Sequence, residues 1–492
     1  MEKLKRTIFF WTLVLMFVII APAIVLYAKG FRFDIARGVF VHSGTISTKT
    51  NPQDVVISLD GKINDSKSLN RVNNSYLIAG LMPKNYDLSI SAAGYQTWSK
   101  NIEVHSGLAS EFWNVFLART SYAKTEYNAP SIEKFFVSPK SKYIIYTKNS
   151  QQEFSANILD LKTKETTNSF TFSDWKFISE DRKENIEWSP DEDYLSVPVE
   201  KTVAGKLQYA YFIVDPLKQT SFNLNSFLKN DIIDYVRWDP KDKNYLFYLS
   251  NNSLYRANIT NPTDIVQIAQ DVSSFDLSKT NVFYSVSPYE LVYSKNLDGS
   301  GTPTQITSNF PEDISKNFRL IVYDNSRIAF LTQSKDLYLF NQGEFATYTR
   351  KLGYDINGIQ FSDDGKKLLY WTDNTMSVYY LRNWNIAPIR SENSIEDITR
   401  YSEKIKNIQW SRDYEHIIFS VGSQMKIIEL DPRDHRNCMD LTTTISKSPV
   451  AVYNQAQERL YLIDTKDDST SLFSIIFPEP TPILGIYTPA NN

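Results

Sequence analysis

The chain has 492 residues, of which 42% are hydrophobic and 22% charged, and this length is enough for two or three domains with sizeable cores. Its formal net charge of −3 offers no basic field for nucleic acid, so nucleic acid is not an expected partner. The single cysteine, Cys438, excludes an intrachain disulfide framework, and no two of the four histidines have metal-ligand spacing on one element. Aromatic residues make up 14% of the chain, which favours strands over helices.

Residues 7–28 form an uncharged apolar run that is long enough to cross a hydrocarbon core of about 30 Å as a helix. We predict a transmembrane helix there, with residues 1–6 as a cytoplasmic tail. A cleaved signal peptide is the alternative, because Ala21-Pro22-Ala23 resembles a small-residue cleavage site. The apolar run continues beyond this point as far as Tyr27, which favours a retained anchor.

The orientation of this helix is left open by charge alone, because the basic residues on its two sides nearly balance. A short N-terminal tail followed by a long body is typical of a signal anchor, and long domains translocate largely regardless of charge. We therefore expect a single-pass protein of the cytoplasmic membrane, with the bulk of the chain outside the cytoplasm.

A juxtamembrane linker, residues 29–42, leads into a unit of short strands and tight turns at residues 43–119. An apolar strand ends at the turn Asp60-Gly61, and the segment Leu81-Met-Pro-Lys-Asn-Tyr86 precedes a strand of alternating polarity. The dipeptide Gly94-Tyr95 precedes the last strand of the unit. This order of strands and turns predicts a small all-β module.

In combination these motifs resemble the PEGA domain, a small β-sandwich-like module. The unit departs from the family pattern at Asp54, where a small residue is usual, and at Lys84, where glycine often follows the proline. The resemblance implies an extracytoplasmic, envelope-associated interaction module without catalytic residues. We expect Tyr86, Tyr95 and Trp98 to pack in its core.

After a polar linker, residues 120–131, one hairpin pattern recurs to the end of the chain. In its clearest copy Ile359 and Phe361 alternate with polar residues, Gly365 lies in the turn, and Leu368 begins the return strand. The spacing of the copies, about 45 residues, is that of a four-stranded propeller blade. The residues that end the first strand of each copy are Ser138, Ser189, Asp239, Ser278, Asp324, Ser362, Ser411 and Asn454.

A single hairpin cannot bury its apolar faces, so a series of them implies stacking of sheets. We predict a β-propeller over residues 132–492 with eight blades, and seven blades as the alternative because the repeat is degenerate. The segments Trp188-Ser-Pro-Asp191 and Trp410-Ser-Arg-Asp413 resemble the signature of WD40-like repeats in TolB-type propellers. The expected fold class is thus all-β, with one N-terminal transmembrane helix, a small β-sandwich-like module and a propeller.

The sequence contains no nucleophile elbow, phosphate-binding loop or His-Glu-x-x-His motif, so we expect no catalytic, cofactor or metal residues. The turn aspartates at residues 191–193 and 363–364 are weak calcium candidates, because isolated turn aspartates more often accept backbone N–H bonds. Binding residues are not identified by the sequence, and we expect them in loops at one end of the blades. Substitutions in the turn 363–365 or the loop 298–304 are expected to leave stability nearly unchanged.

The favoured interpretation is a membrane-anchored, extracytoplasmic and non-enzymatic binding or scaffold protein. It would interact with an envelope protein or a cell-surface polymer through the PEGA-like module and the propeller loops. One alternative is a propeller enzyme, a hydrolase or lyase, with acidic residues from several blades gathered in the central channel. Another is a TolB-like assembly platform in a trans-envelope complex. The sequence leaves the oligomeric state open.

Overall fold

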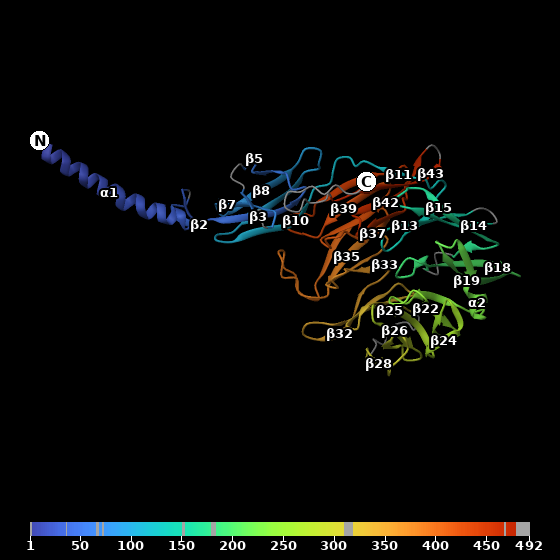
Figure 1. The fold of residues 1–492 in the computed structure, drawn as a ribbon. Coiled ribbons are helices and arrows are strands. Elements are labelled where there is room, and N and C mark those ends of the chain that lie inside the picture. Colours follow the sequence, from blue (N-terminus) through green and yellow to red (C-terminus); the bar gives the residue numbers. More distant parts are fainter. Residues whose placement is uncertain are drawn as a thin grey trace.

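The computed structural model describes residues 2–35, 37–64, 68–70, 73–149, 153–178, 184–308, 318–466 and 469–478. Met1 of the predicted tail and residues 479–492 of the predicted propeller therefore lie outside the described residues. Figure 1 shows three parts in chain order, namely the long helix α1, a sandwich of strands and a propeller. The prediction of an all-β chain with one N-terminal apolar helix is confirmed.

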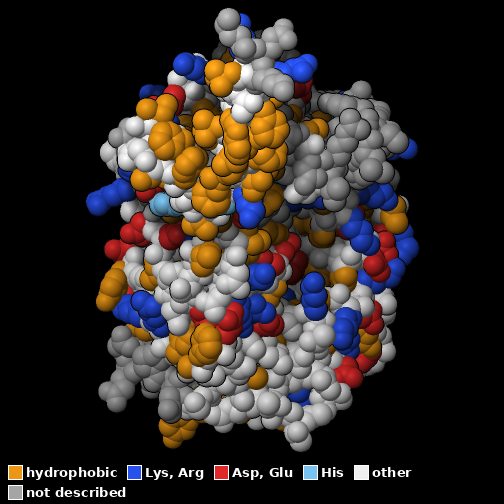
Figure 2. Space-filling model, turned by 90° about the vertical axis from the view of Figure 1, so that its left-hand side faces the viewer, with side chains coloured by type: hydrophobic (Ala, Val, Ile, Leu, Met, Phe, Trp, Pro, Cys, Tyr) orange, Lys and Arg blue, Asp and Glu red, His pale blue; other side chains and the backbone are white. Residues whose placement is uncertain are grey.

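The helix α1 spans Glu2–Ala28 and contains the apolar run. Its stretch Leu4–Ala28 has a mean hydropathy of 2.7 and is not buried by the rest of the molecule, and it is long and apolar enough to cross a membrane. A signal sequence has the same properties. Figure 2 looks onto the side from which α1 projects and shows hydrophobic side chains gathered in the upper part of that face.

The hairpin β1–β2 follows α1 directly, with β1 at Phe31–Asp34 and β2 at Val39–His42. The two strands form a sheet of their own with antiparallel pairing, in which Phe33 lies opposite Phe40. This hairpin occupies the segment that was predicted as a juxtamembrane linker.

Residues 43–119 contain two four-stranded sheets whose inner faces share one core, in the strand orders β10-β3-β7-β6 and β5-β4-β8-β9. The bounds are β3 (Gly44–Asn51), β4 (Val56–Leu59), β5 (Lys62–Ile63), β6 (Ser68–Asn70), β7 (Ser75–Leu81), β8 (Lys84–Ser91), β9 (Trp98–Val104) and β10 (Ala109–Phe116). Every second residue of β9 is buried, which is typical of a sheet with one face on a core. The predicted β-sandwich is confirmed, and we call this unit the sandwich.

The rest of the described chain forms eight sheets of antiparallel strands, which we number as blades 1 to 8. Blades 1 to 4 are β12–β15 (Lys134–Val137, Tyr143–Asn149, Glu153–Asp160, Thr166–Ser173), β16–β20 (Lys176–Phe177, Glu187–Trp188, Leu195–Val203, Lys206–Asp215, Thr220–Asn223), β21–β24 (Asp234–Trp238, Tyr245–Ser250, Ser253–Asn258, Asn261–Ala269) and β25–β28 (Val272–Leu277, Asn281–Val286, Leu291–Asn296, Thr304–Gln305). Blades 5 to 7 are β29–β32 (Phe318–Asp324, Arg327–Thr332, Leu337–Gln342, Thr347–Gly353), β33–β36 (Gly358–Phe361, Lys367–Trp371, Thr375–Tyr380, Ile395–Arg400) and β37–β40 (Ile405–Trp410, His416–Val421, Gln424–Glu429, Cys438–Thr443). A short helix α2, Leu224–Leu228, follows blade 2.

Blade 8 is completed by a strand from the beginning of the propeller. It contains β41 (Ala451–Asn454), β42 (Arg459–Lys466) and β43 (Ser469–Ile476), and its outer strand is β11 (Thr125–Tyr127). Strand β11 pairs antiparallel with β43, so the segment before blade 1 joins the last blade and closes the ring. This strand lies within the segment predicted as the linker 120–131.

The marker residue at the end of the inner strand is a serine in five of the eight blades, and its side chain has a structural role. The hydroxyl of Ser138 accepts a hydrogen bond from the backbone N–H of Tyr143 at 3.0 Å, and Ser189 and Ser362 accept equivalent bonds at the turns of blades 2 and 6. Such a side chain provides an acceptor for a backbone N–H group in the turn between the first two strands of a blade. The predicted spacing of eight repeats is confirmed, because each of the eight marker residues ends or directly follows the inner strand of its own blade.

Neighbouring blades are also joined by a polar residue two positions before the marker. In four places within the described residues, backbone N–H groups of the next blade donate to these side chains. The acceptor and donor pairs are Glu187 with Trp238 (3.2 Å), Asp276 with Val322 (2.8 Å), Gln360 with Trp410 (3.1 Å) and Gln409 with Tyr453 (2.7 Å). This position therefore links consecutive blades, and the apolar residues on either side of it pack between them.

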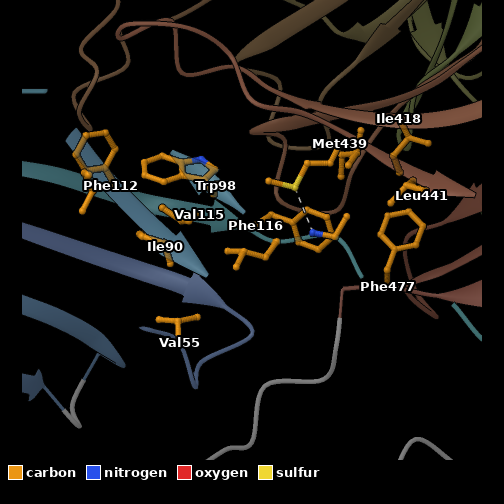
Figure 3. Close-up of a cluster of buried hydrophobic side chains, with 14 of the residues drawn as sticks. Val55, Ile90, Trp98, Phe112, Val115, Phe116, Ile418, Met439, Leu441 and Phe477 are labelled. Atoms are coloured by element: carbon orange, nitrogen blue, oxygen red, sulfur yellow. Dashed lines mark hydrogen bonds between the residues drawn. The ribbon is translucent and has the colours of Figure 1, made fainter. Parts of the chain in front are cut away.

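The sandwich and the propeller share one hydrophobic cluster. Figure 3 shows side chains of the sandwich beside Met439 and Leu441 of blade 7 and Phe477 of blade 8. Phe116 lies between the two units, with its ring 6.2 Å from that of Phe477. The backbone N–H of Ala118 donates to the Sδ atom of Met439 at 3.3 Å.

A buried ion pair lies within the same interface. The Nζ atom of Lys100 on β9 is 2.8 Å from Oε1 of Glu429, and the Lys100 side chain is 0% exposed. Lys100 also donates to the carbonyl oxygens of Asp431 (3.1 Å), Arg433 (2.8 Å) and His435. The indole N–H of Trp98 donates to Oε2 of the same glutamate at 2.8 Å. These bonds fix the orientation of the sandwich on blade 7.

Candidate binding pocket in the propeller

A cavity of about 670 Å³ lies among blades 2 to 5. Its walls come from the segment before β17 and from the inner strands β21, β25 and β29. The ends of β22 and β30, which pair with β21 and β29, complete them. The apolar part of the wall includes Phe275, Leu320 and Leu331, and the charged part includes Glu187, Arg237 and Arg319. We call this cavity the central pocket.

Arg237 on β21 belongs to the framework of the central pocket. Its Nε atom donates to Oε1 of Glu187 at 3.0 Å and its Nη1 atom to Oδ1 of Asp276 at 2.5 Å. The charge of Glu187, and then that of Asp276, raises the pKa of Arg237 despite its partial desolvation. These three residues stand two positions before the markers of blades 2, 3 and 4, so an ion-pair chain crosses three blades.

Arg319 on β29 lines the same cavity without such partners. Among the described residues it makes no hydrogen bond or ion pair, although it is accessible from the cavity. Desolvation, followed by the charge of Arg237, lowers the pKa of Arg319. A guanidinium presents five donors in a planar fork that matches a carboxylate. The central pocket thus presents the guanidinium of Arg319, which has no partner among the described residues, beside an apolar wall.

Two carboxylates that line the pocket already accept framework bonds. Glu187 accepts from Arg237 and from the backbone N–H of Trp238. Glu184 accepts from the hydroxyl of Tyr211, which in turn accepts from the backbone N–H of Tyr235 at 3.0 Å. These acidic side chains support the wall of the pocket through bonds within the propeller.

Sequence reasoning did not identify the residues of this pocket. The available signal was the position two residues before the marker, where a charged residue stands between apolar neighbours at Glu187, Arg237 and Asp276. Arg319 gives no such signal, because it lies five residues before its marker Asp324 and its surroundings come from other blades.

The aromatic residues singled out in the sandwich lie as expected where the structure tests them. Tyr86 and Trp98 are buried in the shared core, and the partly buried Tyr95 packs against it. Trp98 has a second role that was not predicted, because its indole N–H binds Glu429 of the propeller.

The turn aspartates serve as acceptors or ion-pair partners. Asp364 accepts from the hydroxyl of Ser362 at 2.6 Å and from the backbone N–H of Lys366 at 3.0 Å. Asp193 pairs with Lys243. Within the described ranges, no group of three or more His, Cys, Asp or Glu side chains is arranged to hold a metal ion.

The expectation that the turn 363–365 tolerates substitution is wrong at Gly365. This glycine has a φ of +65°, and an added Cβ atom would overlap the side chains of Tyr323 and Arg327 in blade 5. Arg327 donates to the carbonyl oxygen of Gly365 at 2.7 Å, and the Tyr323 hydroxyl donates to that of Asp363 at 2.6 Å. The turn is therefore a contact between blades 5 and 6. The expectation for the loop 298–304 is likewise wrong at Gly299, which has a φ of +79° and where an added Cβ atom would lie 2.9 Å from Cδ1 of Ile268. For the other residues of this loop it stays a prediction.

No family model matches the chain, and no curated protein matches it. Among solved structures, a eukaryotic initiation factor is similar over 72% of this chain and 87% of its own, with 13% identity and a TM-score of 0.44. The β-propeller domain of Cps50 (Swd1) from Myceliophteria thermophila matches 72% of this chain and 98% of its own, with 10% identity and a TM-score of 0.41. The Dos1 propeller matches 73% and 96%, with 12% identity and a TM-score of 0.46. The assignment of a propeller comes from the eight sheets described above.

Proposed function

We propose that this chain is a non-enzymatic, membrane-anchored binding protein whose central pocket holds an acidic segment of an envelope protein or cell-surface polymer. The observation that carries the proposal is the guanidinium of Arg319, which lines the pocket without a partner among the described residues. A carboxylate bound there would pair with Arg319 and offset its repulsion from Arg237. The apolar wall beside it would receive the aliphatic part of the same segment.

The placement at the membrane is supported by the length and hydropathy of α1. The resemblance of residues 43–119 to the PEGA domain supports an extracytoplasmic position in the cell envelope. Because the shared core and the Lys100–Glu429 pair join the sandwich to blade 7, the propeller would be held at one orientation relative to the sandwich. A TolB-like assembly platform would use the same arrangement.

The enzyme alternative draws on the same cavity, since Glu184 and Glu187 line it. General acid–base catalysis needs a carboxyl group that is within reach of substrate and available to exchange a proton. Both oxygens of Glu187 and one of Glu184 accept bonds from the framework. This engagement favours binding over catalysis.

The proposal is tested by proximity labelling in native cells with the full-length protein. We compare the wild type with Arg319→Gln, and with Arg412→Gln as a matched control, because Arg412 is an exposed arginine that pairs with Glu458 at the propeller surface. We expect Arg319→Gln to lose a labelled partner that carries an acidic segment and Arg412→Gln to retain it. Equal labelling by all three proteins would contradict the proposal.

The anchor is tested separately by membrane fractionation. We expect the full-length chain to sediment with membranes and a chain that lacks residues 1–28 to be soluble and folded. Recovery of a mature N-terminus at Ile24 from native cells would show that the segment is a cleaved signal instead.

A further inference from the structure

The hairpin β1–β2 carries an aromatic face that no other element covers in the described chain. Phe33 and Phe40 lie opposite each other with ring centroids 5.1 Å apart, and they are 51% and 52% exposed. Ile35, which follows β1, is 88% exposed, and Val39 is 48% exposed. A two-stranded hairpin alone is at best marginally stable in water, so this sheet gains from a surface that covers its apolar side chains.

The position of the hairpin indicates what that surface is. The helix α1 ends at Ala28 and β1 begins at Phe31, so the apolar face starts directly where the candidate membrane span ends. Figure 1 shows the hairpin beside the C-terminal end of α1. Arg32 holds it there, because its guanidinium lies 3.8 Å from the ring centroid of Tyr27 and donates to the Tyr27 carbonyl oxygen at 3.1 Å.

The charges of this region match a lipid surface. Lys29, Arg32 and Arg37 lie within nine residues of each other, and the described acidic residue among them, Asp34, is 3.7 Å from the Arg37 side chain. Basic residues beside a span are attracted to anionic headgroups, and aromatic residues concentrate at the boundary between headgroups and acyl chains. Tyr27, which is largely exposed on the last turn of α1, stands at the same level.

We propose that the hairpin β1–β2 lies in the lipid–water interface, with Phe33, Ile35 and Phe40 inserted among the headgroups and upper acyl chains of anionic lipids. This inference rests on the proposed retention of α1 as a membrane anchor. In this position the hairpin adds a second membrane contact next to the span. It thereby restricts rotation of the sandwich and the propeller about α1, because the base of the hairpin is joined to the sandwich by the bond from Ser106 Oγ to the His42 carbonyl oxygen.

The inference is tested with a nitroxide label at the hairpin tip of the full-length protein. The single cysteine is first removed by Cys438→Ser, and the label is attached through Ile35→Cys. Phe345→Cys provides the matched control, because Phe345 is 89% exposed on the propeller. Each protein is reconstituted into vesicles of equal parts phosphatidylcholine and phosphatidylglycerol, and collisions of the label with oxygen and with a water-soluble nickel complex are measured.

We expect the ratio of oxygen to nickel collisions to be several-fold higher at position 35 than at position 345, and to fall when Phe33→Asp and Phe40→Asp are introduced together. If the protein floats with the vesicles but the two positions give equal ratios, the hairpin lies in water, and this inference fails while the anchor stands. A label at position 35 that is shielded from both reagents would show a protein cover and would also overturn it. If the protein does not float with the vesicles, the anchor itself fails and the inference falls with it.

Discussion

Replacement of Lys100 by alanine should weaken the docking of the sandwich on the propeller. The Lys100 side chain is 0% exposed, pairs with Glu429 and donates to three backbone carbonyl oxygens of the segment that follows β39. Lys100→Ala removes all four contacts and leaves Glu429 as a buried anion whose remaining donors are the side chain of Trp98 and the backbone and side chain of Asn437.

The expected magnitude follows from what is left unpaired. Removal of one partner of a buried ion pair costs about 3–5 kcal/mol, because the other charge stays in a medium of low polarity. The three carbonyl oxygens that accept from Lys100 lose their donor as well. Water could replace that donor only by entering the interface, which would disrupt the apolar contacts around Phe116. We therefore expect the docking of the sandwich to weaken by about 3–5 kcal/mol, while the core of each unit stays folded. The double variant Lys100→Met with Glu429→Gln should recover part of this loss, because it removes both charges of the buried pair.

Hydrogen–deuterium exchange on the full-length protein in detergent measures this effect. Exchange of β9 and of the segment 431–437 should become much faster in Lys100→Ala, and proteolysis between Arg119 and Thr125 should increase. Lys84→Ala is the control, because Lys84 makes an exposed ion pair with Asp60 in the same sandwich. If Lys100→Ala exchanged like the wild type in both regions, the ion pair would not be what holds the two units together.

Trp410 is fully buried between blades 6 and 7, so Trp410→Ala should lower the free energy of unfolding by about 3–5 kcal/mol, measured by urea denaturation followed by circular dichroism. Gly365→Ala should lower the melting temperature more than Gly205→Ala, because both glycines have positive φ but only Gly365 faces side chains that an added methyl group would overlap. Burial opposes a charge on His416, but the carboxylate of Asp413, 2.6 Å away, raises the pKa of the imidazole above its ordinary value. The stabilisation from protonated His416 should therefore be complete below about pH 6.5 and be lost as the pH rises through the raised pKa, and His416→Gln should abolish this part of the pH dependence of thermal unfolding.

The blades could be predicted from the sequence because their turns impose a local requirement. A serine, aspartate or asparagine ends or follows the inner strand, and its side chain can accept backbone N–H bonds from residues only a few positions away, as those of Ser138 and Ser362 do. The apolar residues one and three positions earlier pack between blades, so every repeat carries the same short pattern. A requirement of this kind involves only neighbouring residues, so it can be recognised in the sequence.

Features that depend on distant residues could not be predicted in this way. The strand β11 has three residues and no periodicity of its own, and its partner β43 lies more than 300 positions later in the chain. Lys100 follows the alternation of a strand whose other inward residues are apolar, and nothing near it in sequence indicates the glutamate that pairs with it. The central pocket is lined by four blades, so the surroundings of Arg319 appear only when the ring has formed.

The most direct test of the proposed function is an experimental structure of the full-length protein bound to the partner found by proximity labelling. We expect a carboxylate of this partner to lie within hydrogen-bond distance of the Arg319 guanidinium, inside the central pocket. A partner that binds only the sandwich and leaves the central pocket empty would contradict it, and the propeller would then be a spacer.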